Sequence, residues 1–182
     1  MRNLTLLTDL YEITMMQAYF KNNNKNKMAI FDVFYRKNPM DGGYAISAGL
    51  EQVIEYINNL HFTEDDINYL ASLKIFEDDF LDYLKNFKFT GDIYAIPEGS
   101  VMFPREPMLE VIAPIMEAQF IETAILNILN HQSLIATKAA RICYAAEGDG
   151  IMEFGLRRAQ GPDAGIYGAR AAGGVILIQT KK

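Results

Sequence analysis

Apolar positions recur at helical spacing over much of the first half of the chain. The spacing predicts four helices, at residues 8–20, 45–60, 63–73 and 77–87. Thr8 and Asp9 are typical N-cap residues for the first helix, and Thr63 with Asp66 three positions later resembles the capping arrangement of the third. Residues 28–36 are rich in aromatic and β-branched side chains, which predicts a strand.

The pattern changes in the middle of the chain. Between Gly91 and Pro114 the apolar runs are short and separated by prolines, which indicates edge strands or a small antiparallel unit because proline cannot donate to a strand ladder. The remaining pattern predicts, in order, helices at 117–130 and 133–146, a strand at 151–154, a helix at 163–172 and a buried strand at 175–178. This order is typical of α/β proteins, so we expect an α+β domain over residues 1–114 and the start of an α/β domain over 115–182.

Composition and charge narrow the class of protein. The chain has 182 residues, of which 50% are hydrophobic and 22% charged, which is typical of a globular protein. A net charge of −6 argues against a nucleic-acid partner, since binding to phosphates needs clustered lysines and arginines. No long apolar run indicates a signal peptide or a membrane span, so we expect a cytoplasmic protein without a membrane partner. The single cysteine, Cys143, excludes an internal disulfide.

The loop EFGLRRAQGPDAG, at residues 153–165, is the strongest candidate for chemistry. It follows a predicted strand and precedes a predicted helix, and ligand-binding groups of α/β proteins gather at the carboxyl ends of strands. Arg157 and Arg158 would offer guanidinium groups to a carboxylate or phosphate, which arginine can bind through two parallel hydrogen bonds. From the spacing alone, a solvated pair of charges in a surface loop explains the two arginines equally well.

Other candidate residues have ordinary structural explanations beside the functional one. Tyr11 lies in the first turn of a predicted helix, where a half-buried aromatic is common. Arg36 ends a predicted strand, and an exposed basic strand end is unremarkable in itself. Thr137, Lys138 and Arg141 share a predicted helix, and the two cations three positions apart form a basic face.

Taken together, the segments resemble nicotinate phosphoribosyltransferases and, more distantly, nicotinamide phosphoribosyltransferases. The resemblance runs from Leu6 to about Ala172 in the segments LLTDLYEITM, FDVFYRKNP, GGYAISAGLE, GDIYAIPEGSVMFPREPML, EAQFIETAILN, QSLIATKAAR and EFGLRRAQGPD. It implies an enzyme of NAD biosynthesis that joins nicotinate to the ribosyl carbon of phosphoribosyl pyrophosphate and releases pyrophosphate. In the family, ATP hydrolysis is coupled through a phosphorylated histidine, and Mg²⁺ accompanies the pyrophosphate.

The resemblance also implies a fold and an assembly. We expect an amino-terminal α+β domain followed by the first part of an irregular α/β barrel of the type II phosphoribosyltransferase kind. We also expect a homodimer with active sites at the subunit interface.

The same resemblance assigns roles to single residues. Phe154 matches the aromatic that stacks on one face of the pyridine ring, and Tyr11 matches the aromatic that reaches the other face from the partner subunit. Arg157 matches an arginine that lines the pyridine and ribose-phosphate pocket, and Arg36 matches a basic residue near the phosphates, also from the partner chain. Four further residues are candidates for lining the site: Arg158, Thr137, Lys138 and Arg141.

The match fails after Ala172, where relatives continue to well over twice this length and carry the phosphorylated histidine. His61 and His131, the two histidines, do not lie in that context. We therefore expect a truncated or frameshifted chain that has no catalytic residue or metal ligand, binds neither Mg²⁺ nor ATP tightly, and is inactive alone. Unpaired strands at its end, notably 175–178, predict poor solubility.

Two alternatives remain open. In the first alternative, the protein uses nicotinamide in place of nicotinate, although the segments RRAQGPD and DLYEIT favour the nicotinate branch. Otherwise it would be a non-catalytic protein that dimerises with a full-length relative and keeps the interface residues Tyr11 and Arg36.

Overall fold

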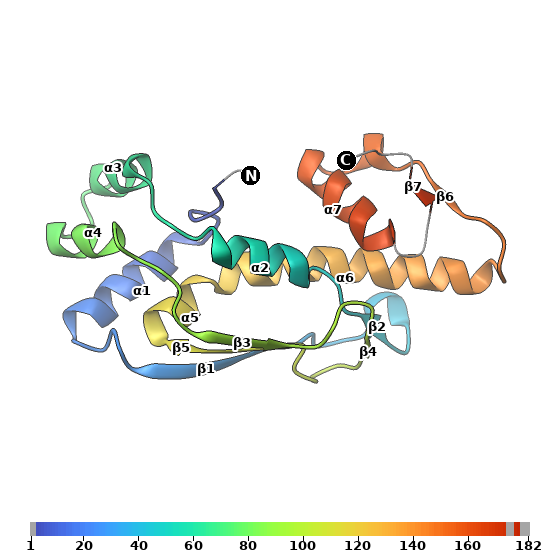
Figure 1. Ribbon diagram of the computed structural model, residues 1–182, viewed down its shortest axis with the longest axis horizontal. Helices are drawn as coiled ribbons and strands as arrows, with labels where there is room; N and C mark the ends of the chain where they lie inside the picture. The colour runs from blue at the N-terminus through green and yellow to red at the C-terminus, as the bar shows by residue number, and fades with distance from the viewer. Residues whose placement is uncertain (1–2, 174–176, 179–182) are drawn as a thin grey trace. The chain divides into compact units, whose positions relative to one another are not determined.

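A computed structural model describes residues 3–173 and 177–178 of the chain (Figure 1). The chain forms two compact units, and each unit is assembled from separated segments. The first unit consists of Met1–Asp32, Glu51–Tyr94 and Leu109–Leu126. The second unit consists of Val33–Leu50, Ala95–Met108 and Asn127–Lys182. No helix within the described ranges is long and apolar enough to cross a membrane.

A three-stranded sheet of order β1-β5-β3 forms one layer of the first unit, with β1 at Met28–Val33, β3 at Asp92–Ala95 and β5 at Leu109–Pro114. The central strand β5 alternates strictly, so that Leu109, Val111 and Ala113 are buried. Gly91, just before β3, passes so close to Ala113 that an added Cβ would collide with it. Short strands are therefore present between Gly91 and Pro114, but β5 is the central strand of this sheet and not the edge strand that its prolines indicated.

Helices supply the rest of the first unit: α1 (Leu10–Lys21), α2 (Leu50–Asn58), α3 (Glu64–Ser72), α4 (Asp78–Leu84), α5 (Ile115–Phe120) and the start of α6 (Glu122–Ala145). Their core contains Phe120, whose ring lies 5.3 Å from those of Phe62 and Phe87. The predicted capping of α3 is confirmed, because the Asp66 amide donates to Thr63 Oγ1 at 3.2 Å and the Thr63 amide donates to Asp66 Oδ2 at 2.8 Å.

The second unit contains two small pairs of strands. Strand β2 (Ala45–Ile46) pairs antiparallel with β4 (Val101–Met102). Strand β6 (Met152–Glu153) pairs parallel with β7 (Leu177–Ile178), and the connection between them contains the 3₁₀ turn η2 (Leu156–Arg158) and helix α7 (Pro162–Gly173). This strand–helix–strand connection has the βαβ order expected at the start of an α/β domain.

Two predicted elements begin or end elsewhere. The helix predicted from residue 45 begins at Leu50, because Ala45–Ile46 pairs with β4 and Gly49 has φ +108°, a left-handed conformation outside the helix. The strand predicted over 28–36 ends at Val33. Beyond it, Tyr35 donates from its hydroxyl to the Met102 carbonyl at 2.7 Å.

The prediction of separate helices at 117–130 and 133–146 was wrong. The break lies at Ile121, between α5 and α6, and α6 then continues without interruption from Glu122 to Ala145. No glycine or proline occurs at positions 131–132, and Thr137 donates to the Ser133 carbonyl at 2.6 Å within the helix. No helix-breaking residue therefore interrupts α6 at the predicted break.

Two other expectations remain predictions. Of the strand predicted at 175–178, residues 175–176 lie outside the described residues, while Leu177–Ile178 forms β7. The domain boundary near Pro114 lies at the last residue of β5 and directly before α5.

Candidate functional site

The loop between β6 and α7 presents the residues singled out for chemistry. Phe154 directly follows β6 and is 51% exposed, so its ring is neither sealed in the core nor free on all sides. Arg157 and Arg158 lie in η2 and are exposed. An exposed aromatic ring and two guanidinium groups therefore lie within five residues of one another at the carboxyl end of a strand, as the sequence predicted.

Short-range contacts define the shape of this loop. Gly155 donates its amide to the Glu153 carboxylate, and the Arg158 amide donates to the Gly155 carbonyl at 2.8 Å. On α7, Gly165 faces η2 so closely that an added Cβ would lie 2.5 Å from Cδ1 of Leu156. Because glycine allows this approach, α7 directly supports the turn that carries both arginines.

A cavity of about 360 Å³ lies between α6, α7 and this loop. Most of its lining is apolar, and the charged or titratable side chains among its walls are His131, Lys138, Glu153 and Arg158. The structure thus brings together Lys138 and Arg158, two of the predicted site-lining residues. A pocket with apolar walls and a few convergent charges is suited to a small ligand with an anionic group.

Two other predicted residues make contacts that support the fold. Thr137 is fully buried, and its Oγ1 accepts a hydrogen bond from the Ile46 amide at 2.8 Å, which joins β2 to α6. Arg141 donates from Nη1 to the Met40 carbonyl at 2.9 Å, where Met40 has φ 56°. Their place in a substrate site remains a prediction, and their observed contacts are structural.

Tyr11 and Arg36 belong to different compact units. Tyr11 lies in the first turn of α1 in the first unit and is 51% exposed. Arg36 is exposed in the turn after β1, within the second unit. Both side chains are therefore accessible in this chain, as a role at a subunit interface requires.

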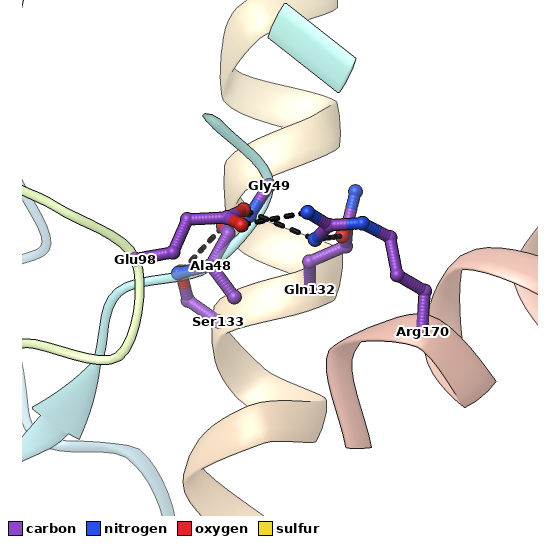
Figure 2. Close-up of polar contacts among 6 residues, drawn as sticks. All are labelled: Ala48, Gly49, Glu98, Gln132, Ser133 and Arg170. Carbon is purple, nitrogen blue, oxygen red and sulfur yellow. Dashed lines mark hydrogen bonds and ion pairs between the residues drawn. The ribbon is translucent and has the colours of Figure 1, made fainter. Parts of the chain in front are cut away.

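An ion pair that the sequence did not predict lies in the second unit (Figure 2). Arg170 of α7 donates to Glu98 through both terminal nitrogens, with Nη2 2.6 Å from Oε2 and Nη1 3.1 Å from Oε1. Arg170 Nη1 also donates to Oε1 of the buried Gln132 on α6 at 3.2 Å, and the Gly49 amide donates to Glu98 Oε1 at 2.6 Å. The cluster joins α7 to α6 and to the turn before α2.

The charge of Glu98 follows from these contacts. Burial by itself raises the pKa of this carboxyl, but hydrogen bonds from Arg170 and from the Gly49 amide outweigh burial and hold the pKa below its ordinary value. Glu98 and Arg170 are separated by 72 residues of sequence. No spacing rule could have paired them.

Two solved structures share this fold. The human nicotinic acid phosphoribosyltransferase superposes with a TM-score of 0.86 and 31% identity, over 97% of this chain and 39% of that protein. The nicotinate-nucleotide pyrophosphorylase of Pyrococcus furiosus superposes with a TM-score of 0.74 at 24% identity, over 98% of this chain and 38% of that protein, which shows the fold alone. The fold is that of the amino-terminal part of type II phosphoribosyltransferases, which confirms the predicted class.

Sequence comparison narrows the class to a family. Residues 6–130 match the family described as nicotinate phosphoribosyltransferase (NAPRTase) N-terminal domain. The nicotinate phosphoribosyltransferase of Bacillus subtilis is 48% identical over 170 residues, which cover 93% of this chain and 35% of the relative. A nicotinate phosphoribosyltransferase of Mycobacterium tuberculosis is 47% identical over 167 residues, which cover 92% of this chain and 36% of the relative. The chain therefore belongs to the nicotinate phosphoribosyltransferase family, and it spans about a third of the length of these curated relatives.

Proposed function

We propose that a protein carrying this chain, completed to the length of its relatives, transfers the phosphoribosyl group from phosphoribosyl pyrophosphate to nicotinate. The products are nicotinate mononucleotide and pyrophosphate. The observation that carries the proposal is the accessible pair of Phe154 and Arg157, three residues apart in the loop after β6, in a chain of this family. Names of the relatives support nicotinate as the acceptor.

We propose that two exposed aromatic side chains bind the pyridine ring of the substrate. Phe154 would stack on one face, and Tyr11 of a partner subunit on the other, which would add about 0.5–1.5 kcal/mol for each ring pair beyond the burial of area. Arg157 would bind the carboxylate or the ribose phosphate through paired hydrogen bonds, and Arg36 of the partner subunit would approach the phosphates. This assignment requires a homodimer, in which each site takes residues from both copies.

Local charge supports anionic substrates despite the net charge of −6. Lys138 and Arg158 line one cavity. Arg157 directly precedes Arg158 in the sequence. Positive groups gathered at one site raise the local concentration of anions and stabilise charge that develops on the leaving pyrophosphate.

We propose that the protein, completed to the length of its relatives, uses Mg²⁺ and ATP. Within residues 3–173 and 177–178, no three His, Cys, Asp or Glu side chains are grouped so that they could hold a metal ion. Mg²⁺ commonly binds through substrate phosphates and only one or two carboxylates, so we infer that it arrives with the pyrophosphate group. We further infer that coupling to ATP needs residues beyond this chain, that the 182 residues alone do not turn over, and that the protein works in the cytoplasm.

A chimaera tests the proposal. This chain replaces the homologous segment of the Bacillus subtilis relative, and the product is assayed with nicotinate, phosphoribosyl pyrophosphate, Mg²⁺ and ATP. We expect nicotinate mononucleotide, and we expect Arg157→Ala to lower kcat/KM on the order of 100-fold, as loss of a donor to developing charge does. Arg157→Lys keeps the charge but not the paired geometry, so its kcat/KM should lie between that of the chimaera and that of Arg157→Ala.

Other outcomes decide against parts of the proposal. A folded chimaera without activity, beside an active parent enzyme, would leave this chain as a non-catalytic dimerisation partner. Preference for nicotinamide over nicotinate would assign the protein to the alternative branch. Mononucleotide formed by the 182-residue chain alone would contradict its inferred inactivity.

A further inference from the structure

Glu12 is a carboxyl group buried beside the first turn of α1. Its side chain has no exposed surface, although the neighbouring Tyr11 is half exposed. Glu12 Oε1 accepts a hydrogen bond from Thr123 Oγ1, near the start of α6, at 3.0 Å. Within the described part of the chain, Oε2 has no hydrogen-bond partner. A buried carboxylate oxygen without a donor is costly, whereas a protonated carboxyl carries no net charge to desolvate.

Among the described residues, the titratable groups near Glu12 are acidic or neutral. Asp9 is the N-cap residue of α1, three positions before Glu12, and Glu122 precedes Thr123 at the start of α6. Tyr56 of α2 also lies near Glu12, and its hydroxyl is buried and likewise without a partner among the described residues. Burial, and then the negative charge of Glu12, raise the pKa of Tyr56, so the phenol is neutral. These neighbours favour the neutral form of Glu12.

We propose that Glu12 is a positioning residue whose neutral side chain holds the first turn of α1, and therefore Tyr11, against the start of α6. The part of this inference that concerns Tyr11 as a substrate contact rests on the proposed function. Three bonds connect the residues: the Glu12 amide donates to the Asp9 carbonyl at 3.0 Å, Thr14 Oγ1 donates to the Tyr11 carbonyl at 2.8 Å, and Thr123 donates to Glu12. Ionisation of Glu12 places an uncompensated charge in this contact and loosens the turn.

The expected pH range follows from the surroundings of the carboxyl. Burial raises the pKa of Glu12 from 4.5 to about 7, the charges of Glu122 and Asp9 act in the same direction, and hydrogen bonds from Thr123 and Tyr11 oppose them. A group whose pKa is higher in the folded state stabilises that state at low pH. This stabilisation is lost as the pH rises from the ordinary value toward the raised one. The turn should therefore loosen between about pH 5 and pH 7, and not tighten.

Amide hydrogen exchange of the 182-residue chain, measured by NMR without any ligand, tests the inference independently of turnover. The amides of Thr14, Met15 and Met16 close the first turn through their helical bonds. After correction for intrinsic exchange rates, we expect their opening constants to increase at least about tenfold between pH 5 and pH 7, the range over which the turn loosens. Leu70 of α3 serves as an internal reference that should change much less.

Three variants make the test specific. Glu12→Gln should remove the pH dependence, and Glu122→Gln, the same chemical change at an exposed neighbour, should keep it with a slightly lower midpoint. Thr123→Val should raise the midpoint, because the hydrogen bond from Thr123 favours the ionised form. A Glu12 carboxyl that titrates at its ordinary pKa in carbon-13 NMR would overturn the inference. So would pH dependence retained in Glu12→Gln, or an equal change at Leu70.

Discussion

Arg170 and Glu98 form a two-point ion pair across 72 residues of sequence, with oxygen–nitrogen distances of 2.6 Å and 3.1 Å. Each side chain is 29% exposed, so the pair lies between a fully solvated contact and a buried one. Because Arg170 belongs to α7 and Gly165 of α7 supports η2, the pair also helps to hold the loop with Arg157 and Arg158.

Removing this contact should destabilise the second unit. Arg170→Ala leaves Glu98 without its cation and deprives the buried Gln132 of a donor, so we expect the free energy of unfolding to fall by about 1–3 kcal/mol. Urea denaturation of the 182-residue chain measures the change. Arg158→Ala, an exposed arginine of the same unit, is the matched control and should change stability by less than about 0.5 kcal/mol. Equal losses in the two variants would contradict the role of the ion pair.

The same pair predicts a dependence on acid pH. Because the pKa of Glu98 is lower in the folded chain than its ordinary value of 4.5, its contribution to stability is present above that value. It is lost as the pH falls below 4.5 and the carboxylate is protonated. The difference in melting temperature between the natural chain and Glu98→Gln should therefore shrink from pH 6 to pH 3. A difference that is constant over this range would show that the charge of Glu98 does not contribute.

Phe154 should matter for binding more than for folding. Its ring is 51% exposed, so Phe154→Ala in the chimaera should raise the KM for nicotinate while the melting temperature changes little. A core phenylalanine would instead cost about 3–5 kcal/mol of stability on truncation. Phe154→Tyr, which keeps a flat ring, is the control that should preserve the KM. An unchanged KM with a large loss of stability would assign the ring to the core.

Gly49 should tolerate no side chain. Its φ is +108°, and an added Cβ would lie 3.1 Å from the Ile128 carbonyl oxygen, so Gly49→Ala should lower the free energy of unfolding by about 1–3 kcal/mol. Gly43→Ala is the matched control, because nothing lies within 4 Å of a Cβ at Gly43 and its backbone is not left-handed. Thermal unfolding of the two variants compares them directly. Similar stability in both would contradict a need for glycine at position 49.

Some features of the protein were determined by short stretches of sequence. The capping of α3 depends on Thr63 and Asp66, three positions apart, and forms as predicted because both partners belong to one helical turn. The strand–turn–helix order around Phe154 and Arg157 likewise follows from local patterns of apolar and glycine positions. Local sequence does not secure every such contact, because Asp9 is the N-cap residue of α1 but makes no capping hydrogen bond with its side chain.

Only the tertiary structure decided the features that join distant segments. Ala45–Ile46 follows a helical pattern but pairs with β4, a strand that is distant in sequence. The contact of Arg170 with Glu98 depends on the packing of elements that are far apart in sequence, as does the burial of Glu12. Long-range packing decides which polar groups are buried and which of them form hydrogen bonds. The spacing of apolar residues along the chain does not predict this outcome.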